Sequence, residues 1–396
     1  MLKLEQILQN KLQLIEEHGL WRQLTPLRFI TPVRAISKTG KEYLVFSSNN
    51  YLGLTHAPEV IAAVKEAAKF GTGSTGSPLT TGRHFEGNRL EKALAAFKHT
   101  ESALIFNTGY MTNLGVIYGL VEKNDVIFSD ELNHASIIDG CRISKAAVKV
   151  YKHSDMQDLQ ELLEKDTTKG QRYIITDGVF SMDGDIAKLP ELVQLAQKYE
   201  ACLYVDDAHA VGVLGADGSG TAAHYGLQGQ VDLQVGTLSK ALASEGGYVA
   251  GKRVYIDYLI NKSRPFIFST ALSPASMAAA KAALELLIGE KDLYLHKLKS
   301  NTELMRSLLV QYDVNIIAGE TPIIPIMLGD AKLTTKFAQR LEKKGILVAA
   351  IRPTTVPIGQ SRLRLTITAA HSEEDIRLTA AAIGKIWQEI QEGYDI

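Results

Sequence analysis

The first stretch of the chain has apolar residues at helical spacing. Leu4, Leu8, Leu12 and Ile15 fall on one face of a helix, and lysine and glutamate residues separate them. A targeting segment would need a continuous apolar run, which these charges interrupt. We therefore expect an amphipathic helix that ends at Gly19.

From about residue 43 the pattern changes to short apolar runs that alternate with stretches of helical spacing. This order is typical of βαβ units that build a mostly parallel sheet. Many runs end in small or polar residues, and ligands of open α/β sheets bind beside the carboxyl ends of the strands. The expected strands are 43–47, 103–106, 126–129, 148–151, 173–176, 202–205, 233–236 and 248–250.

A different pattern follows Pro274. Alanine and leucine at helical spacing over 275–312 predict a long helical region, and Ser372 with Asp375 forms a capping-box pattern before a last helix. Between them we expect strands 323–328, 346–351 and 363–368 and a helix over 332–344. The predicted division is an N-terminal helix and arm (1–45), a large domain (46–275) and a small C-terminal α+β domain (276–396).

Composition narrows the function classes. The 396 residues include 43 lysines and arginines against 44 aspartates and glutamates, so the net charge of −1 gives no basic surface for nucleic acid or an anionic membrane. No apolar run approaches the roughly 20 residues of a membrane span, which predicts a soluble protein. Cys141 and Cys202 form no disulfide or zinc pattern, so we expect a cytoplasmic protein without a bound metal.

Two glycine-rich segments could contact an anion. Residues 71–82 match neither the P-loop nor the Rossmann pattern, which leaves a phosphate-contacting loop and a mobile surface loop as alternatives. Gly109 and Tyr110 follow a strand and open a helix, where backbone N–H groups and the helix dipole favour a phosphate. A glycine required only for a tight turn is the alternative there.

Residues at several strand ends could together hold pyridoxal 5′-phosphate (PLP). This cofactor needs an amine for its aldehyde, an acid beside its ring nitrogen, donors for its phosphate and a flat group against its ring. Lys240, Asp206 and His134 could supply the amine, the acid and the flat group, and Thr237 with the Gly109 turn could supply the donors. Each residue alone is more common in a structural or solvated role, so the combination carries the prediction.

Four segments resemble the α-oxoamine synthases, and the resemblance covers essentially the whole chain. They are 47–53 (SSNNYLG), 177–184 (DGVFSMDG), 205–209 (VDDAH) and 237–240 (TLSK). The resemblance implies an α/β PLP-dependent transferase of the aspartate aminotransferase type (fold type I), with a mostly parallel central sheet and a smaller C-terminal α+β domain. It also implies a homodimer with a shared active site, in which an amino acid condenses with an acyl thioester.

The resemblance also implies residue roles. Lys240 would form the Schiff base with PLP and remove the substrate Cα proton, and Asp206 would pair with the ring nitrogen, with His134 and His209 completing the catalytic set. The implied cofactor contacts are Gly109, Tyr110, His134, Ser181, Asp206, His209, Thr237, Lys240 and, toward the neighbouring subunit, Thr270. The implied substrate contacts are Arg22, Asn49, Arg352, Thr355 and Arg364, with Arg352 as the first choice for the amino-acid carboxylate and Arg364 as its rival.

Residues 350–357 (AIRPTTVP) are similar to the motif of the biotin-pathway branch, the 8-amino-7-oxononanoate synthases, and 264–270 points the same way. That branch joins L-alanine to pimeloyl-CoA or a pimeloyl carrier protein, releasing CO₂ and the free thiol. One departure is Pro78, which stands where the family commonly has arginine. The alternatives are glycine C-acetyltransferase (2-amino-3-ketobutyrate CoA ligase), another α-oxoamine synthase and, more distantly, a PLP aminotransferase.

Overall fold

The protein is described here by a computed structural model that covers residues 3–18, 20–22 and 24–393. The chain forms two compact units. Unit 1 contains 1–49, 182–184 and 299–396, and unit 2 contains 50–181 and 185–298. The division into 1–45, 46–275 and 276–396 stays a prediction. None of the helices in the described residues is long and apolar enough to cross a membrane.

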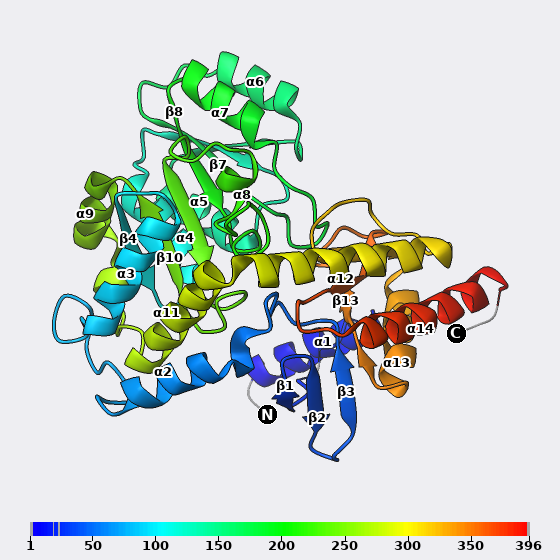
Figure 1. The fold of residues 1–396 in the computed structure, drawn as a ribbon. Coiled ribbons are helices and arrows are strands. Elements are labelled where there is room, and N and C mark those ends of the chain that lie inside the picture. Colours follow the sequence, from blue (N-terminus) through cyan, green and yellow to red (C-terminus); the bar gives the residue numbers. More distant parts are fainter. Residues whose placement is uncertain (1–2, 19, 23, 394–396) are drawn as a thin grey trace. The chain divides into compact units, whose positions relative to one another are not determined.

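Unit 2 is built on a seven-stranded sheet that is mostly parallel, as predicted (Figure 1). The strand expected at 43–47 is not part of it, because β3 (Glu42–Val45) belongs to a sheet of unit 1. Five neighbouring strands run parallel, in the order β6, β5, β7, β8 and β9. Strand β10 is antiparallel to both of its neighbours, β4 and β9. The carboxyl ends of the parallel strands therefore lie along one edge of the sheet. The sheet order is β4 (Ser102–Phe106), β10 (Gly247–Gly251), β9 (Leu233–Thr237), β8 (Ala201–Asp206), β7 (Arg172–Asp177), β5 (Val126–Asp130) and β6 (Ala147–Tyr151).

Helices cover both faces of this sheet. Apolar side chains point alternately to the two faces along each strand and are buried on both, so both faces need a cover. On β5, Ile127 packs into one buried cluster, whereas Val126 and Phe128 pack into another. The Ile127 cluster includes side chains from α4 (Gly109–Leu120), α5 (Ala135–Ser144), α9 (Arg253–Lys262) and α10 (Arg264–Ile267). The other cluster includes side chains from α6 (Met156–Glu164), α7 (Leu189–Lys198) and α8 (Thr221–His224). The other helical elements of unit 2 are η1 (Leu54–His56), α2 (Pro58–Ala68), α3 (Phe85–Phe97) and α11 (Pro274–Gly289).

Unit 1 contains two smaller sheets around one buried core. Its four-stranded sheet is β1 (Leu27–Thr31), β2 (Arg34–Ser37), β3 (Glu42–Val45) and β12 (Ile346–Leu347). Its three-stranded sheet is β11 (Ile323–Gly329), β14 (Ser361–Thr366) and β13 (Ala349–Ile351). Phe46, Phe337 and Ile383 are among the fully buried residues of the core. The helices are α1 (Lys3–Glu17), α13 (Ala331–Lys343), α14 (Glu373–Gln391) and the part of α12 (Lys291–Gln311) from residue 299 onward.

Several predicted elements differ from the structure in detail. The helical region predicted over 275–312 is confirmed and consists of two helices, because α11 ends at Gly289 and α12 (Lys291–Gln311) begins after Glu290. The single strand expected over 346–351 is wrong, since β12 pairs with β3 and β13 pairs with β14. Strands β1 and β2 were not predicted. The N-terminal helix is confirmed and ends at Glu17, whereas Gly19 lies outside the described residues.

The capping box before the last helix is confirmed. The Ser372 hydroxyl accepts from the Asp375 backbone N–H, and the Asp375 carboxylate accepts from the Ser372 backbone N–H, both at 3.1 Å. Three acidic residues in the first turn of α14 also complement the positive end of the helix dipole.

Candidate functional site

The parallel strands of unit 2 present polar residues at their carboxyl ends. His134 follows β5, Asp177 ends β7, Asp206 ends β8 and Lys240 follows β9. Because these strands are neighbours in the sheet, the four side chains start from the same edge. This is the edge at which open α/β sheets bind ligands.

Lys240 and His209 are in contact. Lys240 Nζ lies 2.8 Å from His209 Nε2, and His209 Nδ1 lies 2.6 Å from the Tyr51 hydroxyl. A lysine ammonium can only donate, so beside a charged Lys240 the His209 Nε2 accepts and Nδ1 carries the proton. His209 is buried, and Tyr51 holds its other ring nitrogen, so the histidine is fixed in orientation beside the amine.

Asp206 is buried among neutral donors. The Asn113 side-chain amide donates to one of its oxygens at 2.7 Å, and the Ala208 backbone N–H donates to the other at 2.9 Å. The Tyr204 hydroxyl donates to the Asn113 carbonyl oxygen at 2.5 Å, which fixes the orientation of the amide. Among the described residues Asp206 forms no ion pair, so its carboxylate can take a cationic ring nitrogen as its counter-charge.

His134 is held at the first turn of α5. Its backbone N–H donates to the Asp177 carboxylate at 2.7 Å, and its Nδ1 lies 2.7 Å from the Ser136 hydroxyl. Desolvation lowers the pKa of His134, the Asp206 charge opposes this effect and the Lys240 charge adds to it. Both charged residues therefore act on the imidazole, although its side chain remains exposed at the sheet edge.

The first turn of α4 forms a donor-rich cradle. Thr108 caps this helix by accepting from the Met111 N–H at 3.0 Å, and the N–H groups of Gly109 and Tyr110 lie in the first turn. A Cβ on Gly109 would lie 3.4 Å from Thr237, which is ordinary contact distance, so the start of α4 lies beside the end of β9. Gly109 does not have a positive φ, so its backbone conformation does not require glycine.

The glycine-rich loop 71–82 is packed against the rest of unit 2. Gly76 accepts from the Ala271 N–H at 2.9 Å, and the Ser74 hydroxyl donates to the Leu272 carbonyl at 2.5 Å. A Cβ on Gly82 would lie 2.1 Å from the Gly76 carbonyl oxygen. These glycines therefore allow two backbone segments of the loop to approach closely. This packing role differs from both predicted alternatives, a phosphate-contacting loop and a mobile surface loop.

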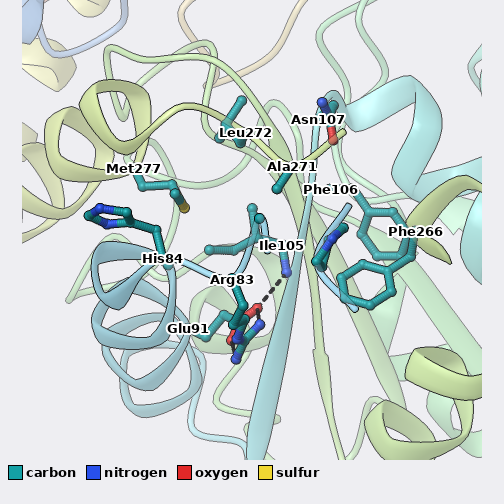
Figure 2. Close-up of a pocket in the computed structure, with 13 residues that line it drawn as sticks. Arg83, His84, Glu91, Ile105, Phe106, Asn107, Phe266, Ala271, Leu272 and Met277 are labelled. Carbon is teal, nitrogen blue, oxygen red and sulfur yellow. Dashed lines mark hydrogen bonds and ion pairs between the residues drawn. The ribbon is translucent and has the colours of Figure 1, made fainter. Parts of the chain in front are cut away.

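Beside that loop lies a small cavity of about 30 Å³ (Figure 2). Arg83 forms an ion pair with Glu91, and Glu91 also accepts from the Ile105 N–H at 3.2 Å. Desolvation raises the pKa of Glu91, and the hydrogen bond and charge of Arg83 oppose this effect. A space of this size accommodates about one water molecule, so it is not a substrate pocket.

Unit 1 brings together two of the predicted substrate contacts. The Arg364 guanidinium donates to the Asn49 side-chain oxygen and to the Thr366 hydroxyl, each at 3.0 Å. The neighbouring Arg362 is buried and forms an ion pair with Asp183. Arg362 therefore has a carboxylate partner within unit 1, and Arg364 meets the Asn49 amide oxygen and the Thr366 hydroxyl there.

The remaining predicted site residues have weaker structural support. Arg352 and Thr355 are joined by a backbone hydrogen bond of 3.0 Å, and Thr355 is exposed. Arg22 is exposed in the segment 20–22. Ser181 follows β7 and is partly buried, whereas Thr270 is exposed and its carbonyl accepts from Asn107 at 2.8 Å.

The family description "Aminotransferase class I and II" matches residues 41–383 of this chain. The chain belongs to this family. It is 46% identical over 383 residues to the 8-amino-7-oxononanoate synthase of Lysinibacillus sphaericus, covering 96% of this chain and 98% of that protein. It is 47% identical over 376 residues to 8-amino-7-oxononanoate synthase 2 of Bacillus subtilis strain 168, covering 95% and 96%.

A solved structure supports the same fold. A serine palmitoyltransferase variant from S. paucimobilis, described with a bound PLP–myriocin aldimine, gives a TM-score of 0.92 at 31% identity, covering 97% of this chain and 98% of that chain. The family membership and this similarity confirm the predicted fold class. They also confirm the predicted resemblance to the α-oxoamine synthases.

Sequence reasoning gave no role to two side chains that hold the predicted site residues. Asn113 is buried and binds Asp206, and Tyr51 binds His209. Asn113 could have been noticed as an amide within an apolar helix, where a buried polar group needs a partner. Tyr51 lies within the 47–53 motif, but spacing alone could not show that it meets a residue far along the chain.

Proposed function

We propose that this protein is an acyltransferase that condenses L-alanine with pimeloyl-CoA or a pimeloyl carrier protein to 8-amino-7-oxononanoate, CO₂ and free thiol, a reaction of biotin biosynthesis. The observation that carries this proposal is the 46% identity, over 96% of the chain, to the 8-amino-7-oxononanoate synthase of Lysinibacillus sphaericus. The motif at 350–357 supports the same branch. The serine palmitoyltransferase neighbour is less similar, at 31% identity.

The residues of unit 2 fit PLP as the cofactor. When bound, this group supplies an aldehyde that takes an amine and a ring that accepts the electron pair released at an amino-acid Cα. Lys240 would hold the aldehyde, and buried Asp206 would keep a proton on the ring nitrogen. The N–H groups of Gly109 and Tyr110, with the Thr237 hydroxyl, would hold the phosphate at the positive end of α4.

The amine of Lys240 would then move a proton. Once a substrate amine has taken its place, the freed Lys240 Nζ can accept the proton from the substrate Cα. His209 stands 2.8 Å from Nζ and would keep the amine oriented, and with Ser181 it would hold the phenolic oxygen of the cofactor. His134 would lie against the ring face and exclude water from it.

The amino-acid carboxylate would bind to Arg364 and Asn49. Their contact of 3.0 Å supports this pair, because a guanidinium and an amide together can hold both oxygens of a carboxylate. We propose that Arg352 and Thr355 contact another part of the substrates. Arg22 is proposed as a further substrate contact.

We further propose a cytoplasmic homodimer in which Thr270 reaches the phosphate held by the neighbouring subunit. Its exposed position in unit 2 is compatible with this role. Both cysteines, Cys141 and Cys202, are free thiols, as expected in a reducing compartment. Sedimentation of the protein with and without cofactor tests the dimer.

Thiol release tests the proposed reaction. The purified protein with PLP is supplied with alanine, glycine or serine against acetyl-, pimeloyl- and palmitoyl-CoA, and free thiol is measured. We expect the highest kcat/KM with alanine and pimeloyl-CoA. Glycine with acetyl-CoA as the best pair would identify a glycine C-acetyltransferase, and amino-group exchange without thiol release would identify an aminotransferase. The Lys240→Ala variant is the control and should lack both turnover and the visible absorbance of lysine-bound cofactor.

A further inference from the structure

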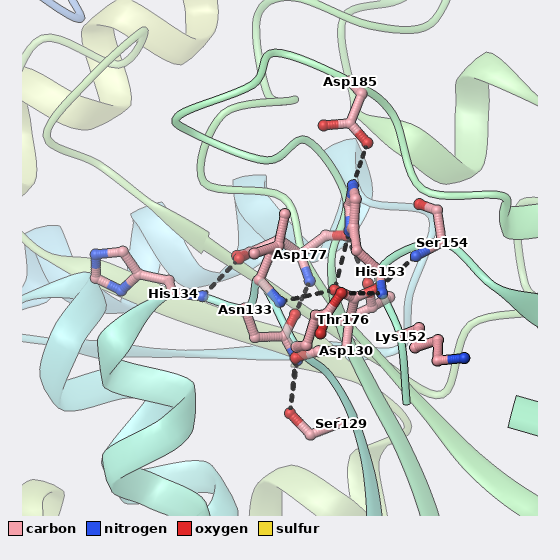
Figure 3. Close-up of polar contacts among 12 residues, drawn as sticks. Ser129, Asp130, Asn133, His134, Lys152, His153, Ser154, Thr176, Asp177 and Asp185 are labelled. Carbon is pink, nitrogen blue, oxygen red and sulfur yellow. Dashed lines mark hydrogen bonds and ion pairs between the residues drawn. The ribbon is translucent and has the colours of Figure 1, made fainter. Parts of the chain in front are cut away.

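A network of buried and partly buried polar groups extends from His134 to His153 and Asp185 (Figure 3). His153 Nδ1 lies 3.0 Å from Asp130, and its Nε2 lies 2.9 Å from Asp185. The ring of Phe180 meets the imidazole edge to face, with centroids 4.4 Å apart. The imidazole is therefore fixed between two carboxylates and one aromatic ring, all within unit 2.

Both nitrogens of His153 face acceptors, so both must donate. Only the imidazolium has two N–H donors, because the neutral ring would leave one carboxylate facing a lone pair. Burial by itself would lower the pKa of His153, but the hydrogen bonds and charges of Asp130 and Asp185 raise it to about 10. The ring is therefore a permanent cation near neutral pH.

Asp130 links His153 to the segment that leads to His134. One Asp130 oxygen accepts from His153 and from the Leu132 N–H at 2.9 Å, and the other accepts from the Ser154 N–H at 2.9 Å. Asp130 is buried, so loss of the His153 donor would leave a buried charge with fewer partners. The imidazolium thus fixes the start of the turn between β5 and α5.

Asn133 and Asp177 fix the other end of the same turn. Asn133 donates to the Ile175 carbonyl at 2.8 Å and accepts from the Asp177 N–H at 2.8 Å. The Asp177 carboxylate then accepts from the His134 N–H at 2.7 Å. The chain from His153 to His134 is continuous, and it sets the backbone from which the His134 ring projects.

We propose that His153 is a positioning residue, which holds the turn between β5 and α5 and thereby sets the His134 imidazole against the cofactor ring. This inference rests on PLP as the proposed cofactor. His153 touches neither the cofactor nor the substrate in this role. It acts only through Asp130 and the backbone that ends at His134.

The experiment is a double-mutant cycle on cofactor binding. Apo protein is titrated with PLP, and the dissociation constant and the visible circular dichroism of bound PLP are measured for wild type, His153→Gln, His134→Ala and the double variant. We expect His153→Gln to weaken PLP binding roughly tenfold and to alter the dichroism band, because it removes one of two charged hydrogen bonds. In the His134→Ala background the same substitution should add less than about twofold.

Independent effects in the cycle, or a His153→Gln variant with wild-type affinity and dichroism, would overturn the inference. Wild type that fails to bind PLP would instead contradict the proposed function. His99→Gln is the matched control, because His99 also meets a carboxylate, 2.9 Å away on Asp217, but is exposed and outside this network. If His153→Gln does not fold, Asp185→Asn keeps Asp130 intact and should produce a smaller loss in the same direction. An Asp185→Asn variant with unchanged PLP binding and dichroism would then count against the role.

Discussion

Each unit places two like charges close together in the chain and uses them differently. In unit 2, Asp206 accepts from neutral donors, whereas the next residue, Asp207, forms a fully buried ion pair with Lys98 at 2.7 Å. In unit 1, Arg362 forms an ion pair with Asp183, whereas Arg364 donates to neutral side chains. Asp206 is proposed to meet the cofactor, and Arg364 is proposed to meet the substrate.

This comparison shows how the fold separates structural charges from functional ones. A buried charge needs either a counter-charge or a ligand, since its desolvation is costly. Asp207 has its counter-charge within the protein, because Lys98 at the end of α3 reaches it and the Thr221 hydroxyl also donates to it at 2.6 Å. Asp206 would obtain its counter-charge only when the cofactor binds.

The largest effect is expected at the buried pair. Lys98→Met should lower the free energy of unfolding by about 3–5 kcal/mol, because it leaves Asp207 buried without a cation. The measurement is urea denaturation of the apo protein. Lys165→Met is the control, since Lys165 forms a solvent-exposed ion pair with Glu161. This pair should contribute about 1 kcal/mol or less to the free energy of unfolding. Equal losses in both variants would contradict a structural role for the Asp207 pair.

Asp206→Asn should lower activity more than stability. We expect kcat to fall about 10²–10³-fold, because an amide cannot keep a proton on a ring nitrogen, while unfolding of the apo protein changes little. Asp207→Asn should instead chiefly lower stability, because Lys98 then loses its counter-charge. Steady-state kinetics and denaturation of both variants decide the matter. If the two variants proved alike in both measurements, the distinction between the two aspartates would fail.

A buried histidine gives unit 1 its own pH dependence. His371 is buried, and desolvation lowers its pKa to about 4, although its Nε2 donates to the Val45 carbonyl oxygen, which opposes this effect. The unfolded chain binds the proton at an ordinary value of about 6.5, so stability from this group is present above that pH and is lost as pH falls toward 4. The loss should be on the order of 3 kcal/mol and should be absent in His371→Asn. Thermal unfolding across this range measures it, and an equal acid sensitivity in the variant would refute it.

The smallest effect is expected from a conservative change at the proposed carboxylate site. Arg364→Lys should raise KM for the amino acid about 10–100-fold with a smaller change in kcat, because lysine lacks the two-pronged contact. Arg362→Lys is the matched control and should leave this KM unchanged while weakening the contact with Asp183. Titration of initial rates with alanine gives both values. An unchanged KM in Arg364→Lys would favour Arg352 as the carboxylate ligand.

Much of the fold followed from periodicity. The strands of the seven-stranded sheet were predicted because their apolar runs are short and end in polar residues, and a parallel sheet buried on both faces requires that pattern. The helix break at Glu290 was missed because alanine and leucine continue at helical spacing on both sides of it. Strands β1 and β2 were missed because they are short, β1 is largely exposed and β2 buries only one residue.

Some residues of the candidate site could be predicted from the sequence, and the contacts that hold them could not. Local order in the sequence was sufficient to nominate Lys240, Asp206 and His134, since each follows or ends a strand and ligands bind at strand ends. The contacts of the supporting residues could not be predicted, because Asn113 meets Asp206 and Tyr51 meets His209 across the fold. His153 is linked to His134 only through Asp130 and the residues between them. A hydrogen bond depends on distance in space, which spacing along the chain does not give.

The sequence by itself determined the fold class, the family and the residues with the right chemistry at the strand ends. The tertiary structure alone decided which of two equivalent charges is neutralised by the protein. Asp206 and Asp207 are chemically identical, and only the approach of Lys98 from α3 distinguishes them. The reason is physical, because burial makes the availability of a charge depend on its partners, and those partners come from distant parts of the chain.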